Sequence, residues 1–174
     1  LGWACWKTYL GRPDTDGNRC NAMSFVGNAL RHSRPEETLP VLEANLVLTR
    51  RYWSHDEDAV LNAQAGLANC FCNLGRDAEA LVLRRMIHDR LKAMHGVSDE
   101  RTIRGGANLV ISLNQLELWD EARSISRDRL LPVARQSLGS DHDLTLYLNQ
   151  SLAHALFFNP ERTRDDLLEA ETIM

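Results

Sequence analysis

LANCFCNLGRDAEA, residues 67–80, decides the fold, because related segments follow it at a constant interval. The pattern recurs as LVISLNQLELWDEA at 109–122 and as LAHALFFNPERTRDDLL at 152–168. The leucines that open the three segments lie 42 and 43 residues apart. A fixed period of this length indicates an array of similar structural units.

The breaks between units recur with the same period. Asp14 lies 42 residues before Asp56, and Gly96 lies 43 residues before Gly139. We therefore predict one repeat array over residues 1–174, with approximate repeats 12–54, 55–96, 97–139 and 140–174, the last of them truncated. The first residue is not Met, and we expect the segment to be part of a longer protein.

Each repeat is predicted to form two helices. Leu67, Phe71 and Leu74 follow steps of four and three residues, which place them on one face of a first helix. The second helices are expected to begin near Glu37, Glu79 and Glu121. A single hairpin cannot bury its own apolar face, so stacked hairpins should form an all-α solenoid without a sheet.

Start and break signals refine the helix boundaries. Ser33 with Glu36, and Ser54 with Glu57, match the capping box that begins helices. Pro40 and Pro132 fall inside or near second helices and should bend or interrupt them, because proline lacks the amide hydrogen.

Composition excludes several function classes. Hydrophobic residues make up 44% of the chain and charged residues 25%, with a net charge of −4. This balance argues against a broad phosphate-binding surface, so we expect no nucleic-acid partner. No apolar run reaches the roughly 18 residues of a membrane span. Residues 1–10 do not resemble a signal peptide, and the four cysteines form no pairing framework, so we expect free thiols in the cytoplasm.

The repeats resemble a known family. Leu67-Ala68, Phe71, Leu74-Gly75-Arg76 and Glu79-Ala80-Leu81 resemble the tetratricopeptide (TPR) signature. The period of about 42, with the turn at 139–143 followed by Leu144-Thr145-Leu146, is similar to the kinesin light chain subgroup. The resemblance implies an α-α superhelix whose first helices line a concave groove that binds peptides or protein segments and catalyses no reaction.

Positions i, i+4, i+7 and i+11 of each first helix mark the face that would line this groove. These positions are Cys20, Ser24, Gly27 and Arg31; Asn62, Gly66, Asn69 and Asn73; Arg104, Asn108, Ile111 and Gln115; and Tyr147, Ser151, His154 and Phe158. Asn and Gln can both donate to and accept from a peptide backbone, and Arg can pair with a carboxylate. The predicted binding residues are Arg31, Asn62, Asn69, Asn73, Arg104, Asn108, Gln115, Tyr147 and His154. A purely solvated polar face is the alternative interpretation.

Other motifs do not match the chemistry that they suggest. Cys70-Phe71-Cys72 lacks a second ligand pair for zinc, and residues 14–18 lack the glutamate of a calcium loop. Gly105-Gly106 is not followed by the Lys-Ser/Thr of a phosphate loop, and either close helix packing or ligand access would explain it. We expect no catalytic residue, metal or cofactor.

The sequence therefore favours a non-catalytic scaffold or adaptor that binds protein or peptide segments, and it leaves the oligomeric state open. One alternative is a sensor or regulatory segment of a larger signalling or nucleotide-hydrolysing (STAND-type) protein. An alternative of another class is a helical enzyme or a nucleic-acid binder that uses the basic cluster of Arg84, Arg85, Arg90 and Lys92.

Overall fold

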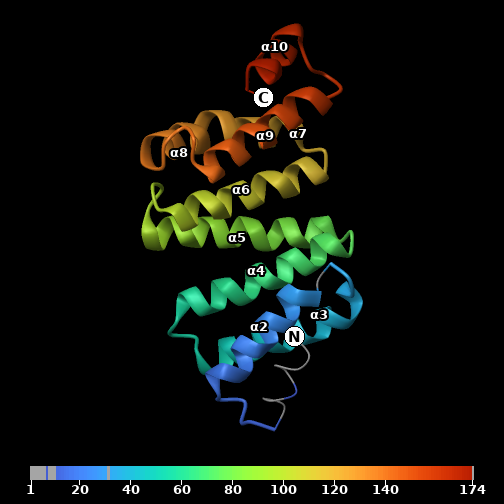
Figure 1. The fold of residues 1–174 in the computed structure, drawn as a ribbon, viewed down its shortest axis with the longest axis vertical. Helices are drawn as coiled ribbons and strands as arrows, with labels where there is room; N and C mark the ends of the chain where they lie inside the picture. Colours follow the sequence, from blue (N-terminus) through green and yellow to red (C-terminus); the bar gives the residue numbers. More distant parts are fainter. Residues whose placement is uncertain (1–6, 8–10, 31, 174) are drawn as a thin grey trace. The chain divides into compact units, whose positions relative to one another are not determined.

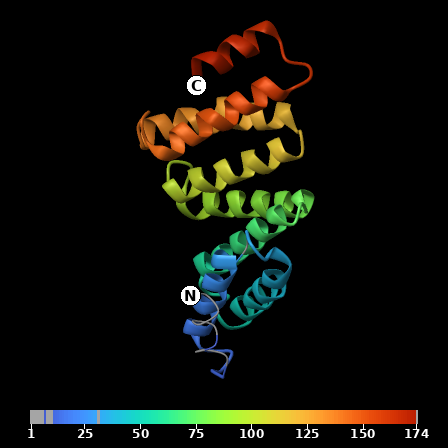
Figure 2. The same ribbon diagram turned by 45° about the vertical axis from the view of Figure 1, so that its right-hand side comes forward.

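The computed structural model describes residue 7, residues 11–30 and residues 32–173. The chain divides into two compact units, Leu1–Leu83 and Arg84–Met174, and we describe each by itself. Throughout the described ranges the regular elements are helices, and no strand occurs among them. The prediction of an all-α chain is confirmed (Figures 1 and 2).

Unit 1 begins with the first predicted hairpin. Its helices are α2 (Gly17–Leu30), α3 (Pro35–Tyr52), α4 (Glu57–Asn73) and the start of α5 (Asp77–His95). The second helix α3 packs against both first helices, α2 and α4, and α2 also contacts α4 (Figure 1). The core is built from Leu42 and Leu46 of α3 together with Leu67, Cys70 and Phe71 of α4.

Unit 2 contains the rest of α5 and the later hairpins. They consist of α6 (Glu100–Gln115), α7 (Trp119–Ser124), the π-helix η1 (Ile125–Leu130), α8 (Leu131–Ser137), α9 (Asp143–Phe158) and α10 (Arg164–Ile173). The first helix α9 contacts α6, the α7–η1–α8 segment and α10 (Figure 2). Its buried face presents Leu148, Leu152 and Leu156, each at most 1% exposed.

The predicted capping boxes are wrong, because another side chain caps α4 and no side chain caps α3. Asp56, not Ser54, caps α4, and its Oδ1 accepts from the Ala59 amide at 3.0 Å. At α3 the N-cap is Arg34, which makes no side-chain capping bond, and Pro35 occupies the first turn. The start of α3 is therefore favoured by the fixed φ of Pro35 and not by a hydroxyl that accepts a hydrogen bond.

The two prolines of the second helices behave differently. Pro40 lies inside the continuous helix α3, near its start. Pro132 follows η1, where the Leu131 amide donates to the Ser126 carbonyl, five residues back. Because Pro132 has no amide hydrogen, it offers nothing to the carbonyl four residues before it, and the widened π turn lies immediately before that gap. The predicted interruption is thus confirmed at Pro132, whereas α3 continues through Pro40.

Close packing in unit 1 depends on Gly27, which faces Leu42, whereas a second glycine near this leucine, Gly66, leaves more room. A Cβ added at Gly27 would meet Cδ2 of Leu42 and lie 2.9 Å from its Cγ. A Cβ added at Gly66 would lie 3.5 Å from Leu42 Cδ2, an ordinary contact. Leu42, 2% exposed, therefore inserts from α3 against the backbone of α2 and reaches α4 as well.

Two glycines of unit 2 also lie against leucine side chains of neighbouring helices. A Cβ at Gly105 would lie 2.9 Å from Leu91 Cδ1, and one at Gly106 would lie 2.7 Å from Leu130 Cδ2. Both glycines are buried in α6. Of the two explanations that the sequence left open for Gly105-Gly106, the structure supports close helix packing.

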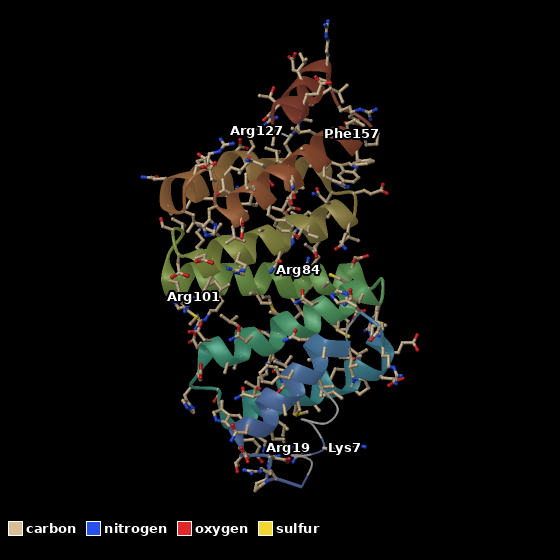
Figure 3. All side chains as sticks on the ribbon, viewed as in Figure 1. Lys7, Arg19, Arg84, Arg101, Arg127 and Phe157 are labelled. Atoms are coloured by element: carbon tan, nitrogen blue, oxygen red, sulfur yellow. The ribbon has the colours of Figure 1, made fainter. Side chains whose placement is uncertain are left out.

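The last hairpin is fixed by Asp166 in the first turn of α10. Its Oδ2 accepts from the amide and the hydroxyl of Thr163, both at 2.8 Å, and the Asp166 amide donates back to the hydroxyl at 3.2 Å. Arg123 of α7 donates to Oδ1 at 3.3 Å, and Arg127 of η1 pairs with Glu169 of α10 (Figure 3). These donors lower the pKa of Asp166, with the Thr163 bonds as the largest cause.

The glycine contacts predict opposite effects for two identical substitutions. Gly27→Ala should lower the free energy of unfolding, because overpacking costs about 1–3 kcal/mol. Gly66→Ala should instead raise it by about 0.5–1 kcal/mol, because Ala is the better helix former and Leu42 leaves room for it. Urea unfolding followed by circular dichroism measures both. Equal changes in the two variants would show that Leu42 does not distinguish the positions.

The lowered pKa of Asp166 predicts a pH-dependent contribution to stability. A carboxyl whose pKa is depressed by folding stabilises above its unfolded value of about 3.9, and the contribution is lost as pH falls through the folded value. Asp166→Asn should cost about 1 kcal/mol at pH 7, within the range for capping residues, and the difference from the parent should shrink below pH 4. Urea titrations from pH 7 to 3 test this. Glu171→Gln, an exposed change on the same helix, is the control, and a pH-independent difference at Asp166 would contradict the assignment.

Candidate functional site

A pocket of about 380 Å³ lies between the first helices α6 and α9 of unit 2. Its lining residues are Ile111, Asn114 and Gln115 of α6 and Gln150, Ser151 and His154 of α9. Ile111 and Gln115 belong to the predicted stripe of one first helix, and Ser151 and His154 to that of the next. The structure therefore brings together residues from two stripes that the sequence places 43 residues apart.

Asn114 forms the polar part of this pocket. It is 8% exposed, and its Nδ2 donates to the Ser151 carbonyl at 2.9 Å. Its Oδ1 is buried and accepts no hydrogen bond from the residues that the structure describes. A buried acceptor without a donor costs about 1–3 kcal/mol. The Ser151 hydroxyl, by contrast, donates to the Tyr147 carbonyl at 2.9 Å.

A row of rings continues from the pocket along α9. The His154 ring lies 5.8 Å from that of Trp119 and 4.5 Å from that of Phe158, measured between centroids. Phe157 lies 5.2 Å from Phe158 and is 50% exposed at the end of α9 (Figure 3). Exposed aromatic rings supply contact area at a low entropic cost and are enriched where proteins bind partners.

A second pocket, of about 360 Å³, lies within unit 1. Cys20, Asn21 and Ser24 of α2 face Asn62 of α4 across it. Asn45 of α3 also lines it, and its Nδ2 donates to the Ser24 hydroxyl at 3.0 Å. As in unit 2, the pocket joins the stripes of two successive first helices. Burial raises the pKa of the Cys20 thiol, so this side chain is neutral at pH 7.

Three of the predicted binding residues line these pockets. Asn62 is exposed in the pocket of unit 1, and Gln115 and His154 are exposed in the pocket of unit 2. Their placement agrees with the predicted stripe, but ligand contact remains a prediction for each of them.

Four other predicted residues lie on the first helices α4, α6 and α9 without lining either pocket. Asn69 is half-buried and Asn73 is exposed on α4. Arg104 is exposed and pairs with Glu100 one turn earlier on α6. Tyr147 is 42% exposed on α9.

The remaining two predicted residues are Asn108 and Arg31. The carbonyl of half-buried Asn108 accepts from Nη1 of Arg84 at 2.7 Å, so the backbone of this residue serves the packing of α5 on α6 (Figure 3). Arg31 lies outside the residues that the structure describes.

Sequence reasoning missed Asn45 and Asn114. Asn45 lies on a second helix, where no binding residue was sought, and Asn114 lies one residue before the predicted stripe position Gln115. Each is an amide next to a leucine, Leu46 or Leu113, but polar residues also stand close by, Glu43 and Gln115. The sequence therefore offered no signal that either side chain is buried.

Two of the four cations of the basic cluster on α5 bind protein atoms. Arg84 is 8% exposed and also donates to the Ser112 hydroxyl at 2.9 Å. Arg85 pairs with Glu121 at 2.6 Å. Arg90 and Lys92 are exposed on the same helix.

The described ranges contain neither a metal-binding cluster nor a helix that could span a membrane. No group of three or more His, Cys, Asp or Glu side chains in them is arranged to hold a metal ion. Nor does any helix of this part combine the length and apolar character needed to cross a bilayer. His88 is half-buried against the Thr102 carbonyl at 3.2 Å, and burial lowers its pKa, so its ring is neutral at pH 7.

Comparison with known proteins identifies the fold. No protein-family profile and no curated protein matches the sequence. Solved structures of a Podosopora anserina protein with nearly identical kinesin light chain TPR-like repeats do match. A substituted form gives a TM-score of 0.80 at 16% identity over 96% of this chain and 78% of that one. Another structure of it gives 0.77 at 17% identity over 96% and 80%.

A third similar structure is BtubC (BKLC) from P. vanneervenii, with a TM-score of 0.72 at 12% identity over 99% of this chain and 68% of that one. Structural similarity at identities this low establishes the fold and leaves the activity open. The chain therefore has the all-α, TPR-like solenoid fold of kinesin light chain-type repeats, as the sequence resemblance implied.

Proposed function

We propose that the chain is a non-catalytic platform that binds extended peptide or protein segments along the polar faces of its first helices. The observation that carries the proposal is the pocket between α6 and α9, where Asn114 keeps an unpartnered buried Oδ1 beside Gln115 and His154. Pockets between the helices of an array are common ligand sites. The exposed side chains of Gln115 and His154 in its lining offer an amide and an imidazole to such a ligand.

An extended peptide supplies the complementary chemistry. Its backbone amides donate at regular spacing, and its carbonyls accept from amide side chains such as that of Gln115. The rings of Trp119, His154 and Phe158 continue from the pocket and offer an apolar surface for a side chain of the same segment. Polar anchoring next to an aromatic patch is the usual composition of a peptide site.

The free cysteines bear on the cellular location of the proposed platform. Cys20, Cys70 and Cys72 are free, and burial raises the pKa of the Cys70 thiol as it does that of Cys20. Free thiols persist in reducing compartments, so we place the platform in the cytoplasm as an adaptor. The TPR-like structural neighbours are consistent with a scaffold of this type.

The central test is peptide selection followed by mapping. Peptides selected from a random library against the whole chain should shift amide resonances of Ile111, Ser151 and His154 in ¹⁵N-HSQC spectra. His154→Ala should weaken the selected peptide about tenfold, because it removes a ring that contacts two neighbours. Gln136→Ala, an exposed change on α8, should have no effect. Selected peptides that shift only α8 or α10, or a selection without binders, would overturn the proposal.

A charge reversal at Arg104 tests whether this residue contributes to peptide binding or to folding. Arg104→Glu should weaken a selected acidic peptide at least threefold, because it reverses a charge on the binding face. The change also puts two glutamates one turn apart, which costs about 0.2–0.5 kcal/mol. The melting temperature should therefore fall only slightly. Loss of the folded state in this variant would show that Arg104 is structural, and unchanged affinity would remove it from the binding face.

A further inference from the structure

We propose that another pocket of unit 2, called here the second-helix pocket, binds a small aliphatic molecule that carries one carboxylate group. The pocket has a volume of about 400 Å³ and lies among α5, the connection to α6, α6 itself and the α7–η1–α8 segment. None of its lining residues lines either pocket of the first helices. The inference therefore goes beyond the proposed function and does not depend on it.

The interior of the second-helix pocket is aliphatic. Leu109 of α6 and Leu130 of η1 line it and are 4% and 6% exposed. Half-buried Ile125 and Val133 continue this wall. Val97, in the connection between α5 and α6, also lines the pocket and is 48% exposed. Because removal of apolar surface from water favours binding, an aliphatic chain is the occupant that suits this wall.

The inner wall is held in place by contacts with α6. A Cβ added at Gly106 would lie 2.7 Å from Cδ2 of Leu130 and 3.1 Å from Cε1 of His88, so both lining side chains pack on the bare backbone of this helix. Nδ1 of His88 lies 3.2 Å from the Thr102 carbonyl, which can only accept, and therefore donates to it. Burial lowers the pKa of His88, so the ring is neutral at pH 7 and adds no charge to the wall. The pocket is thus largely pre-formed, as ligand sites usually are.

The charged side chains of the pocket leave an excess of positive charge. Arg85, Lys92 and Arg129 line it together with two acids, Asp89 and Glu121. Arg85 and Glu121 pair with each other at 2.6 Å, which leaves two cations and one carboxylate. Neither Lys92 nor Arg129 forms an ion pair with another residue that the structure describes. The excess is opposite in sign to the net charge of −4 of the chain, and one carboxylate on a ligand would neutralise it.

The two available cations come from different elements of the pocket. Lys92 lies on α5 and Arg129 on η1, and both are exposed, whereas Leu109 and Leu130 are buried. The pocket therefore has a charged rim and an apolar interior. A carboxylate at the rim can accept charge-assisted hydrogen bonds from an ammonium and a guanidinium together. This arrangement orients the ligand with its carboxylate outward and its chain inward.

The π-helix provides an independent observation. Ile125, Arg129 and Leu130 are three of the six residues of η1, and all three line the pocket. π turns are rare and are found frequently at functional sites. The widened turn therefore supplies the pocket with two aliphatic side chains and one of its two available cations.

The experiment uses octanoate, octanamide, octylamine and acetate as probes, each titrated below its micelle concentration into the whole chain. Octanoate should shift the methyl resonances of Val97, Ile125 and Val133 saturably in ¹³C-HSQC spectra. It should bind at least tenfold more tightly than octanamide or octylamine, because its carboxylate accepts hydrogen bonds from charged donors. Acetate lacks the chain and should leave these methyls unshifted. Equal affinity for octanoate and octylamine, or no saturable shift of these methyls, would overturn the inference.

A double variant tests the two cations. Lys92→Gln with Arg129→Gln should weaken octanoate about tenfold, to the affinity of octanamide, because it removes both charged donors. Binding of octanamide and the melting temperature should stay nearly unchanged, since both residues are exposed. Lys7→Gln with Arg164→Gln removes the same charge from exposed positions outside the pocket and is the matched control. Undiminished octanoate binding in the first variant, or an equal loss in both, would contradict the role of these cations.

The same titration separates this inference from the proposed function. Octanoate should leave the amide resonances of Ile111, Ser151 and His154 in place, because these residues line the pocket between α6 and α9. Octanoate shifts confined to those amides would place the ligand in that pocket and overturn the second-helix site. A peptide selection without binders would remove the proposed platform, whereas saturable octanoate shifts at Val97 and Val133 would still support the carboxylate site.

Discussion

The packing of second-helix leucines against first-helix glycines is the constraint on which the rest of the structure depends. Leu42 inserts against Gly27 and Gly66 in unit 1, and Leu130 and Leu91 insert against Gly106 and Gly105 in unit 2. A glycine in mid-helix sacrifices helix propensity, and the close approach of a neighbouring helix compensates by burying apolar area. Gly27 and Gly66 belong to the predicted stripes, so part of the face that was expected to line the groove in unit 1 packs against Leu42.

Each of the two pockets along the first helices contains a buried asparagine whose side-chain oxygen has no partner among the described residues. Asn45 and Asn114 each make one bond through Nδ2 to a neighbouring helix and leave Oδ1 without a partner in the described structure. Each amide thus fixes the packing of its pocket wall. The two pockets differ in their surroundings: carboxylates and an indole in unit 1, and neutral amides beside a row of rings in unit 2.

The hairpins also differ in how their second helices are built. The helix α3 continues through Pro40, because a proline near the start of a helix disturbs few hydrogen bonds. Pro132 lies later in its helix, and the chain adjusts through the π-helix η1. That segment provides Leu130, which packs on Gly106, and Arg127, which pairs with Glu169 of α10. The widened turn therefore packs on α6 within the third hairpin and also contacts α10 of the last hairpin.

The sequence by itself determined the helical class and the TPR-like type of repeat, because these depend on the local spacing of residues such as Leu67, Phe71 and Leu74 and on recurrent glycines. Gly96 and Gly139 both adopt positive φ after a helix, as their equivalent positions in the period imply. The stripe rule also placed Asn62, Gln115 and His154 on the face that the pockets occupy. It missed the capping of α4 by Asp56, since several polar residues precede that helix and only the backbone conformation selects one of them.

Only the tertiary structure decided which polar side chains are buried without a partner and which are merely solvated. Asn45 and Asn114 look like other amides in the sequence, and their status depends on the helices packed around them. Likewise Gly105-Gly106 admitted two explanations until Leu91 and Leu130 were seen against them. Such properties arise from contacts between residues distant along the chain, and a local pattern cannot specify the distances that those contacts adopt.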